Sequence, residues 1–148
     1  FATANDVTGI PPELLRKGRF DEMFSVDLPN KEERKEILEI HIKKKNRSHL
    51  VSGGKIDINR LSGETSEGFT GAEIEAAINE AMYAAFDSEK DLNDFDLQHA
   101  FDNTNPLSKT MKEKIDKIRE WCERRTRPAN TPEQQTQVVA TSGRSVQV

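Results

Sequence analysis

The apolar pattern of residues 74–85 constrains the fold more strongly than any other part of the sequence. Its apolar side chains recur at intervals of three and four residues, as on one face of an α-helix: Ile74, Ala77, Ile78, Ala81, Met82 and Ala85. Thr70 and Glu73 have the spacing of a capping box, so the helix is predicted to begin at Gly71. Because alanine is small, a neighbouring helix can approach this face closely. The pattern therefore predicts a helix packed among other helices.

Two helices are predicted before this one, each from a capping residue followed by an apolar stripe. The first follows Asn30, with Glu33 completing a capping box, and its apolar stripe, which includes His41, runs to about residue 45. The second is a short helix that follows Asp57. Residues 46–55, which lie between the two, contain two glycines and are expected to form a loop.

Two more helices are predicted after the long one. The first is expected to start at Asn93 or Asp94, and the second at Ser108 or Thr110. Thr110 and Glu113 again have capping-box spacing, and the apolar stripe that follows continues as far as residue 122. The chain from residue 30 to residue 127 is therefore expected to be helical wherever it is regular.

The first 29 residues have a different pattern. Phe24, Val26 and Leu28 alternate with polar residues, which predicts a strand, and residues 1–4 resemble the end of another. Two strands are too few for a stable sheet, so we expect the segment to end an α/β domain whose earlier strands are absent. The expected organisation is the end of an α/β core in 1–29, a helical domain in 30–104, a C-terminal helix in 105–127 and a flexible tail in 128–148.

Composition excludes several classes of protein. No apolar run approaches the ~20 residues of a membrane span, and we expect no signal peptide. Cys122 is the only cysteine, which excludes an internal disulfide and indicates a reducing, intracellular compartment. Three scattered histidines give no metal-ligand spacing, so we expect no metal site within these residues. The net charge of −4 argues against nucleic-acid binding, although two short basic runs end the first and last helices.

Two separated motifs resemble those of the AAA ATPase family. Asn5 follows a short apolar stretch, and eleven residues later residues 16–21 read Arg-Lys-Gly-Arg-Phe-Asp, as in that family's second region of homology. Residues 68–74 read Gly-Phe-Thr-Gly-Ala-Glu-Ile, which is similar to the signature of the family's helical lid. The resemblance covers about residues 1–104. It implies a mainly α fold, with a helical lid bundle attached to the terminal strands of an α/β P-loop-type core that is missing from this chain.

The resemblance assigns catalytic roles to three residues. Arg16 and Arg19 correspond to arginine fingers, which reach the nucleotide of a neighbouring subunit and are worth ~10³–10⁵ in rate. A guanidinium suits this role because it is permanently charged and its donors match phosphate oxygens. Asn5 corresponds to the sensor that orients the attacking water. From the residues alone, surface ion pairs for the arginines and a turn cap for Asn5 remain the alternatives.

Three lid residues are implied to contact the nucleotide. Gly71 and Ala72 open the long helix, where small residues and unbonded N–H groups allow a ligand to approach the backbone. The resemblance places them near the adenine and ribose, and places His41 beside the nucleotide. The alternatives are an ordinary capped helix start for Gly71 and Ala72, and a packed boundary residue for His41.

The sequence lacks two motifs that an ATPase needs. There is no Gly-x-x-x-x-Gly-Lys-Ser/Thr phosphate loop and no apolar strand ending in Asp-Glu. We therefore expect ATP and Mg²⁺ to be held by residues outside this sequence, and the chain to be inactive alone. Lys17 also departs from the family's usual proline, and Asp6 from the arginine that often follows the sensor.

The expected function is that of a C-terminal fragment of an AAA ATPase, which supplies sensor, arginine fingers and lid to ATP hydrolysis coupled to protein remodelling. The resemblance implies a homo-oligomer, a hexameric ring in the full protein, and a protein substrate. The alternative is a non-catalytic helical module that binds other proteins. We expect the cytoplasm or the plastid stroma as its location, because residues 106–113 also resemble plastid and cyanobacterial-type AAA proteins.

Overall fold

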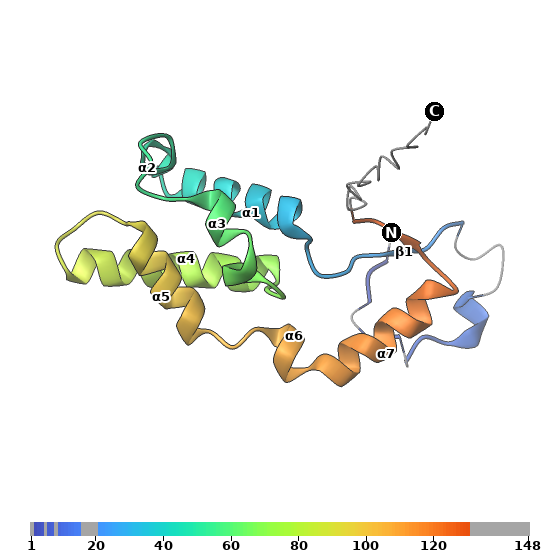
Figure 1. Cartoon of the computed structure of the whole chain (residues 1–148). Helices are drawn as coiled ribbons and strands as arrows, with labels where there is room; N and C mark the ends of the chain where they lie inside the picture. The colour runs from blue at the N-terminus through green and yellow to red at the C-terminus, as the bar shows by residue number, and fades with distance from the viewer. Residues whose placement is uncertain (1, 5, 8, 16–20, 131–148) are drawn as a thin grey trace, which may run out of the picture.

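The computed structural model describes residues 2–4, 6–7, 9–15 and 21–130. A bundle of helices forms one end of the molecule, and α6 and α7 lead away from it toward strand β1 (Figure 1). The predicted mainly α fold is confirmed, and the bundle is consistent with a helical lid. No helix in the described part of the chain is long and apolar enough to cross a membrane.

The bundle contains five α-helices and a short 3₁₀ helix, in chain order α1 (Lys31–Lys44), α2 (Ser48–Ser52), α3 (Ile58–Leu61), η2 (Glu64–Ser66), α4 (Gly71–Asp87) and α5 (Asp94–Asn103). Helix α4 lies at its centre, between α1 and α5. The α4 side chains predicted to face inward are buried, except Met82, which is partly buried. Phe69 and Phe101 meet edge to face at 5.2 Å between ring centroids, which joins the chain before α4 to α5.

Capping boxes fix where the main helices begin. Asn30 with Glu33 and Thr70 with Glu73 form the two boxes predicted for α1 and α4. Asn93 caps α5 and forms a third box with Asp96. In each box the side chains satisfy backbone N–H groups that have no partner inside the helix. The starts of these helices were therefore predictable to the residue or nearly so.

The sequence predicted a loop over residues 46–55, but the short helix α2 forms within this range. Leu50 explains the difference: it is 2% exposed and packs into the core of the bundle. Burial of one large apolar side chain stabilises this short helix, which lacks a side-chain N-cap. Asp57 caps α3, as predicted, by accepting a hydrogen bond from the Arg60 N–H.

The remaining elements lie outside the bundle and are η1 (Pro12–Leu15), β1 (Phe24–Ser25), α6 (Leu107–Thr110), α7 (Lys112–Glu123) and β2 (Arg127–Pro128). The strands are parallel, with Phe24 opposite Arg127 and Ser25 opposite Pro128. The predicted strand over 23–28 is thus much shorter than expected. Residues 128–130, which we expected in the flexible tail, are instead bonded to the first segment.

The last predicted helix is interrupted. Thr110 ends α6 and Met111 precedes α7 with no side-chain cap, so the predicted capping box of Thr110 with Glu113 does not form. The Thr110 hydroxyl instead donates to the carbonyl oxygen of Leu107, one turn back. The apolar stripe of α7 is half-buried at Ile115, Ile118 and Cys122, and no α7 residue is fully buried.

Candidate functional site

The six predicted site residues divide into two groups. Asn5, Arg16 and Arg19 lie outside the described residues, so their roles stay predictions. Gly71 and Ala72 begin α4, and His41 lies on α1. The structure therefore describes the lid half of the predicted site. No group of three or more potential metal-ligating side chains occurs among the described residues.

Gly71 and His41 belong to the same contact between α1 and α4. A Cβ atom on Gly71 would lie 3.7 Å from Ile37 Cδ1. One turn farther along both helices, His41 Nδ1 lies 3.4 Å from Glu75 Oε1, in a geometry that forms no hydrogen bond. Because the second contact lies four residues later on both α1 and α4, the two helices run parallel here. Only 13% of the His41 side chain is exposed, as expected for a packed boundary residue.

The start of α4 presents backbone donors. Glu73 Oε2 accepts hydrogen bonds from both the N–H and the hydroxyl of Thr70, each at 2.8 Å, and Thr70 Oγ1 accepts from the Glu73 N–H. The N–H groups of Gly71 and Ala72 bond to no acceptor within the part of the chain that the structure describes. They can therefore donate to a ligand. The Glu73 carboxylate repels a phosphate here, so a neutral adenine or ribose edge suits these donors better.

A groove lies between the lid and the C-terminal helix. It encloses about 1140 Å³ and is lined by residues 25–29, by Ile37 of α1, by Gly71 of α4, and by Ile118 and Cys122 of α7. Apolar side chains of the lining suit the flat face of an aromatic ring, and charged residues, among them Glu33, Glu36, Arg119 and Glu123, also line the groove. Of the three described candidates, Gly71 lines the groove, whereas His41 and Ala72 do not.

Arg34 is an important residue of this region whose role was not predicted. It is 7% exposed, and its guanidinium donates to the carbonyl oxygens of Ser62, Gly63 and Pro29 at 2.8 to 3.2 Å. It therefore joins the chain before α1 to the end of α3. The available signal was its spacing, because Arg34 lies four residues before Leu38 on the buried face of α1.

The start of α4 is also joined to α6, which the sequence did not predict. Glu73 Oε1 accepts a hydrogen bond of 2.7 Å from the Leu107 N–H, so one carboxylate caps both α4 and α6. Gly68 has φ +78°, and a Cβ there would overlap the Ser108 hydroxyl. Gly68 therefore has two reasons to be glycine, a left-handed backbone and the close approach of α6.

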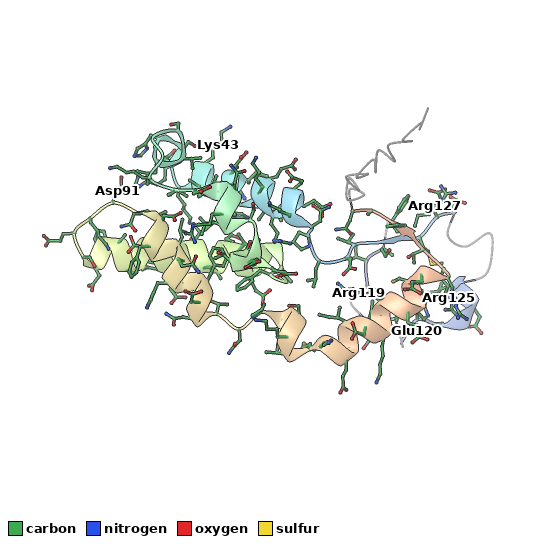
Figure 2. All side chains as sticks on the ribbon, viewed as in Figure 1. Lys43, Asp91, Arg119, Glu120, Arg125 and Arg127 are labelled. Carbon is green, nitrogen blue, oxygen red and sulfur yellow. The ribbon has the colours of Figure 1, made fainter. Side chains whose placement is uncertain are left out.

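One ion-pair cluster of the bundle lies away from the start of α4. Asp91, in the loop after α4 and labelled in Figure 2, pairs with Arg47 at 2.7 Å and with His49 of α2 at 3.5 Å. Loss of surrounding water would raise the pKa of Asp91, but the Leu92 N–H, Arg47 and His49 together lower it below 3.8. This contact joins the loop after α4 to the start of α2 and has a structural role.

Comparison with known proteins assigns the bundle to a family. Residues 55–99 match the AAA+ lid domain. The chain is 43% identical over 121 residues to the AAA domain-containing protein ycf46 of Pyropia yezoensis, and 47% identical over 122 residues to that of Gracilaria tenuistipitata. Each alignment covers 82% of this chain and 24% of the relative, so the chain spans about a quarter of the length of these curated relatives.

A more distant relative is the ATP-dependent zinc metalloprotease FtsH of Burkholderia pseudomallei, which is 33% identical over 119 residues, 77% of this chain and 17% of the relative. No solved structure matches the chain. The lid match includes α3 and α4 and ends within α5, and the ycf46 alignments extend well beyond it along the chain. The chain carries a C-terminal AAA ATPase region that includes an AAA+ lid domain and resembles the plastid-type ycf46 proteins.

Proposed function

We propose that this chain is the C-terminal part of an AAA ATPase and contributes to ATP hydrolysis coupled to remodelling of a protein substrate. The lid covers the nucleotide through Gly71 and Ala72, with His41 in the supporting contact between α1 and α4. Asn5 acts as the sensor. Arg16 and Arg19 reach the nucleotide of the next subunit in a hexameric ring. ATP and Mg²⁺ are held mainly by residues outside this sequence. The protein acts inside the cell, in the cytoplasm or the plastid stroma.

One observation carries the proposal. The lid signature of residues 68–74 forms the capped start of α4, and Gly71 lies on the wall of the groove between the lid and the C-terminal helix. Gly71 has room for a methyl group, since a Cβ would make ordinary contact with Ile37. Its small size is therefore not required by packing, and close approach of a ligand to the backbone gives a reason for it.

Exposed apolar side chains of the first segment support a position for this segment beside a larger core. Phe24 is 60% and Val26 84% exposed, and both belong to the alternating apolar pattern from which a strand was predicted. β1 has one strand neighbour among the described residues, β2. Exposed apolar side chains along a strand are typical of a surface that another part of a protein covers. Further strands of an α/β core would cover this surface.

Substitution of Arg16 tests the proposed catalytic role. In the complete protein, Arg16→Ala should leave ATP binding intact and lower turnover by roughly 10³-fold, because the transition-state charge loses its guanidinium. Lys17→Ala is the matched control, since it removes a neighbouring cation from the same segment. Turnover per subunit that is unchanged in Arg16→Ala, or equally reduced in both variants, would contradict the finger role.

The second candidate is a helical module that binds another protein without hydrolysing ATP. The exposed aromatic side chains of Tyr83, Phe86 and Phe95 on α4 and α5 favour it, because such residues are common in protein interfaces. ATP binding by the complete protein separates the candidates. The module should bind its partner equally with and without ATP, whereas the ATPase should bind ATP and lose turnover on Arg16→Ala.

A further inference from the structure

We propose that residues 105–130, here called the C-terminal connector, join the start of α4 to the linker between β1 and α1 and so fix the orientation of the lid relative to β1. The linker comprises residues 26–30. Asn130 and Arg119 are the positioning residues at its contact with the connector. The orientation itself is a property of this fold, and only its effect on ATP turnover rests on the proposed function.

The connector is attached to the lid at its first turn. The Leu107 N–H donates to Glu73 Oε1 at 2.7 Å, and the backbone of Gly68 lies directly against Ser108. Pro106, just before α6, is buried. Because Glu73 also caps α4, a displacement of the start of α4 moves the acceptor that holds α6. This end of the connector therefore moves together with the segment that carries Gly71 and Ala72.

The other end of the connector is bonded to the linker through one amide side chain. Asn130 Oδ1 accepts from the Asp27 N–H at 2.8 Å. Asn130 Nδ2 donates to Glu33 Oε2 at 3.0 Å, and more weakly to the carbonyl oxygens of Asp27 and Leu28. Glu33 Oε2 also accepts from the Asn30 N–H in the α1 capping box. Asn130 therefore bonds both to the linker and to the first turn of α1.

Arg119 of α7 makes the second contact with the linker. Its Nε and Nη2 donate to the Asp27 carboxylate at 2.8 to 3.0 Å (Figure 2). Hydrogen bonding to Asp27 raises the pKa of Arg119 above its usual value, despite some desolvation, so the guanidinium stays charged. A two-pronged contact of this kind fixes direction as well as distance. It holds α7 against the linker.

Strand pairing and Arg34 complete the arrangement. The Arg127 N–H donates to the Met23 carbonyl and the Ala129 N–H to the Ser25 carbonyl, at 2.9 and 2.8 Å. From the lid side, Arg34 donates to the Pro29 carbonyl. The linker is thus bonded to the lid on one side and to the connector on the other. Because the connector is also bonded to α4, the lid cannot rotate about the linker unless one of these contacts breaks.

The arrangement leads to a specific expectation for the proposed ATPase. A nucleotide that contacts the N–H groups of Gly71 and Ala72 lies within one turn of the Glu73 carboxylate that holds α6. A shift of α4 on nucleotide binding would then move α6 and α7, and with them the contacts of Arg119 and Asn130. The connector would couple the state of the nucleotide to the angle between lid and core.

The distance between α1 and α7 tests the proposal directly. Spin labels can be introduced through unnatural amino acids in place of Glu39 on α1 and of Glu120 on α7, which Figure 2 labels; both residues are exposed. In the otherwise unchanged full chain, electron paramagnetic resonance should give one narrow distance distribution. Asn130→Ala should broaden and shift it. Asn59→Ala, which truncates an exposed asparagine on α3 away from the linker, should leave it unchanged.

Reversal of the charges of Arg119 and Asp27 gives a second test, in which a restoring double variant separates loss of this contact from loss of the fold. Arg119→Glu should broaden the distribution, because two carboxylates then face each other, and Asp27→Arg added to it should restore the narrow distribution. Distance distributions that are unchanged in both Asn130→Ala and Arg119→Glu would overturn the proposal. It would also be overturned if the reversed pair did not restore the narrow distribution while circular dichroism shows intact helices.

ATP turnover measured on the same variants separates this proposal from the proposed function. If the complete protein neither binds nor hydrolyses ATP, the proposed function fails, and the distance measurements still decide whether the connector fixes the lid. If ATP turnover is normal and the distances respond neither to Asn130→Ala nor to Arg119→Glu, the connector proposal alone fails.

Discussion

Substitution of Gly68 should destabilise the chain far more than substitution of Gly71, although both glycines belong to the same lid signature. Gly68 has φ +78°, and left-handed backbone costs an ordinary residue roughly 1–2 kcal/mol. A Cβ there would also overlap the Ser108 hydroxyl and lie 3.2 Å from Ser108 Cβ, and such overpacking costs roughly 1–3 kcal/mol. Gly68→Ala should therefore lower the free energy of unfolding by about 2–5 kcal/mol.

Gly71→Ala is the matched control. Its Cβ would make ordinary contact at 3.7 Å with Ile37, and helical backbone suits alanine, so stability should stay the same or rise by up to about 1 kcal/mol. Urea denaturation followed by circular dichroism measures both variants. Ser108→Ala added to Gly68→Ala should recover part of the loss, because it removes the hydroxyl. Equal effects of the two glycine substitutions, or no recovery by Ser108→Ala, would refute the reasoning.

Three further substitutions test the packing, the caps and the electrostatics. Ile78→Ala should cost about 2–5 kcal/mol in urea denaturation, because this α4 side chain is 0% exposed, whereas the exposed Tyr83 should tolerate alanine. Glu73→Ala should cost about 1–2 kcal/mol and accelerate hydrogen exchange at Leu107, and Glu73→Gln should do less, since it keeps an acceptor for that N–H. Asp91 has a lowered pKa, so its ionised form stabilises the folded chain: Asp91→Asn should lower the urea midpoint above about pH 4, and the difference should disappear as the pH falls below that range.

The sequence predicts local features of this fold well, because they depend on residues near one another in the chain. The capping boxes at Asn30 and Thr70 and the buried face of α4 were readable from spacing alone. Local patterns were less reliable where a tertiary contact decides the structure. Burial of Leu50 stabilises α2 where a loop was predicted. At Met111 the helix is interrupted, although a continuous helix was predicted.

The candidate site was predicted less completely. The position of Gly71 at the capped start of α4 followed from the Thr70–Glu73 spacing, but its place in the groove depends on α7, which is distant in the sequence. The contacts of Asn130 with Asp27 and of Glu73 with Leu107 join residues 103 and 34 positions apart. No periodicity or motif predicts such pairs, because neither partner constrains the local backbone of the other.

Hydrogen exchange at the start of α4 tests the central claim most directly. In the complete protein, ATP with Mg²⁺ should slow amide exchange in a peptide covering residues 68–75, because the Gly71 and Ala72 N–H groups gain an acceptor. Exchange at the Asp91 contact, at the far end of the bundle, should not change. Slowed exchange at residues 68–75 alone is the result that the account predicts. ATP binding with unchanged exchange there would contradict the assignment of this groove to the nucleotide.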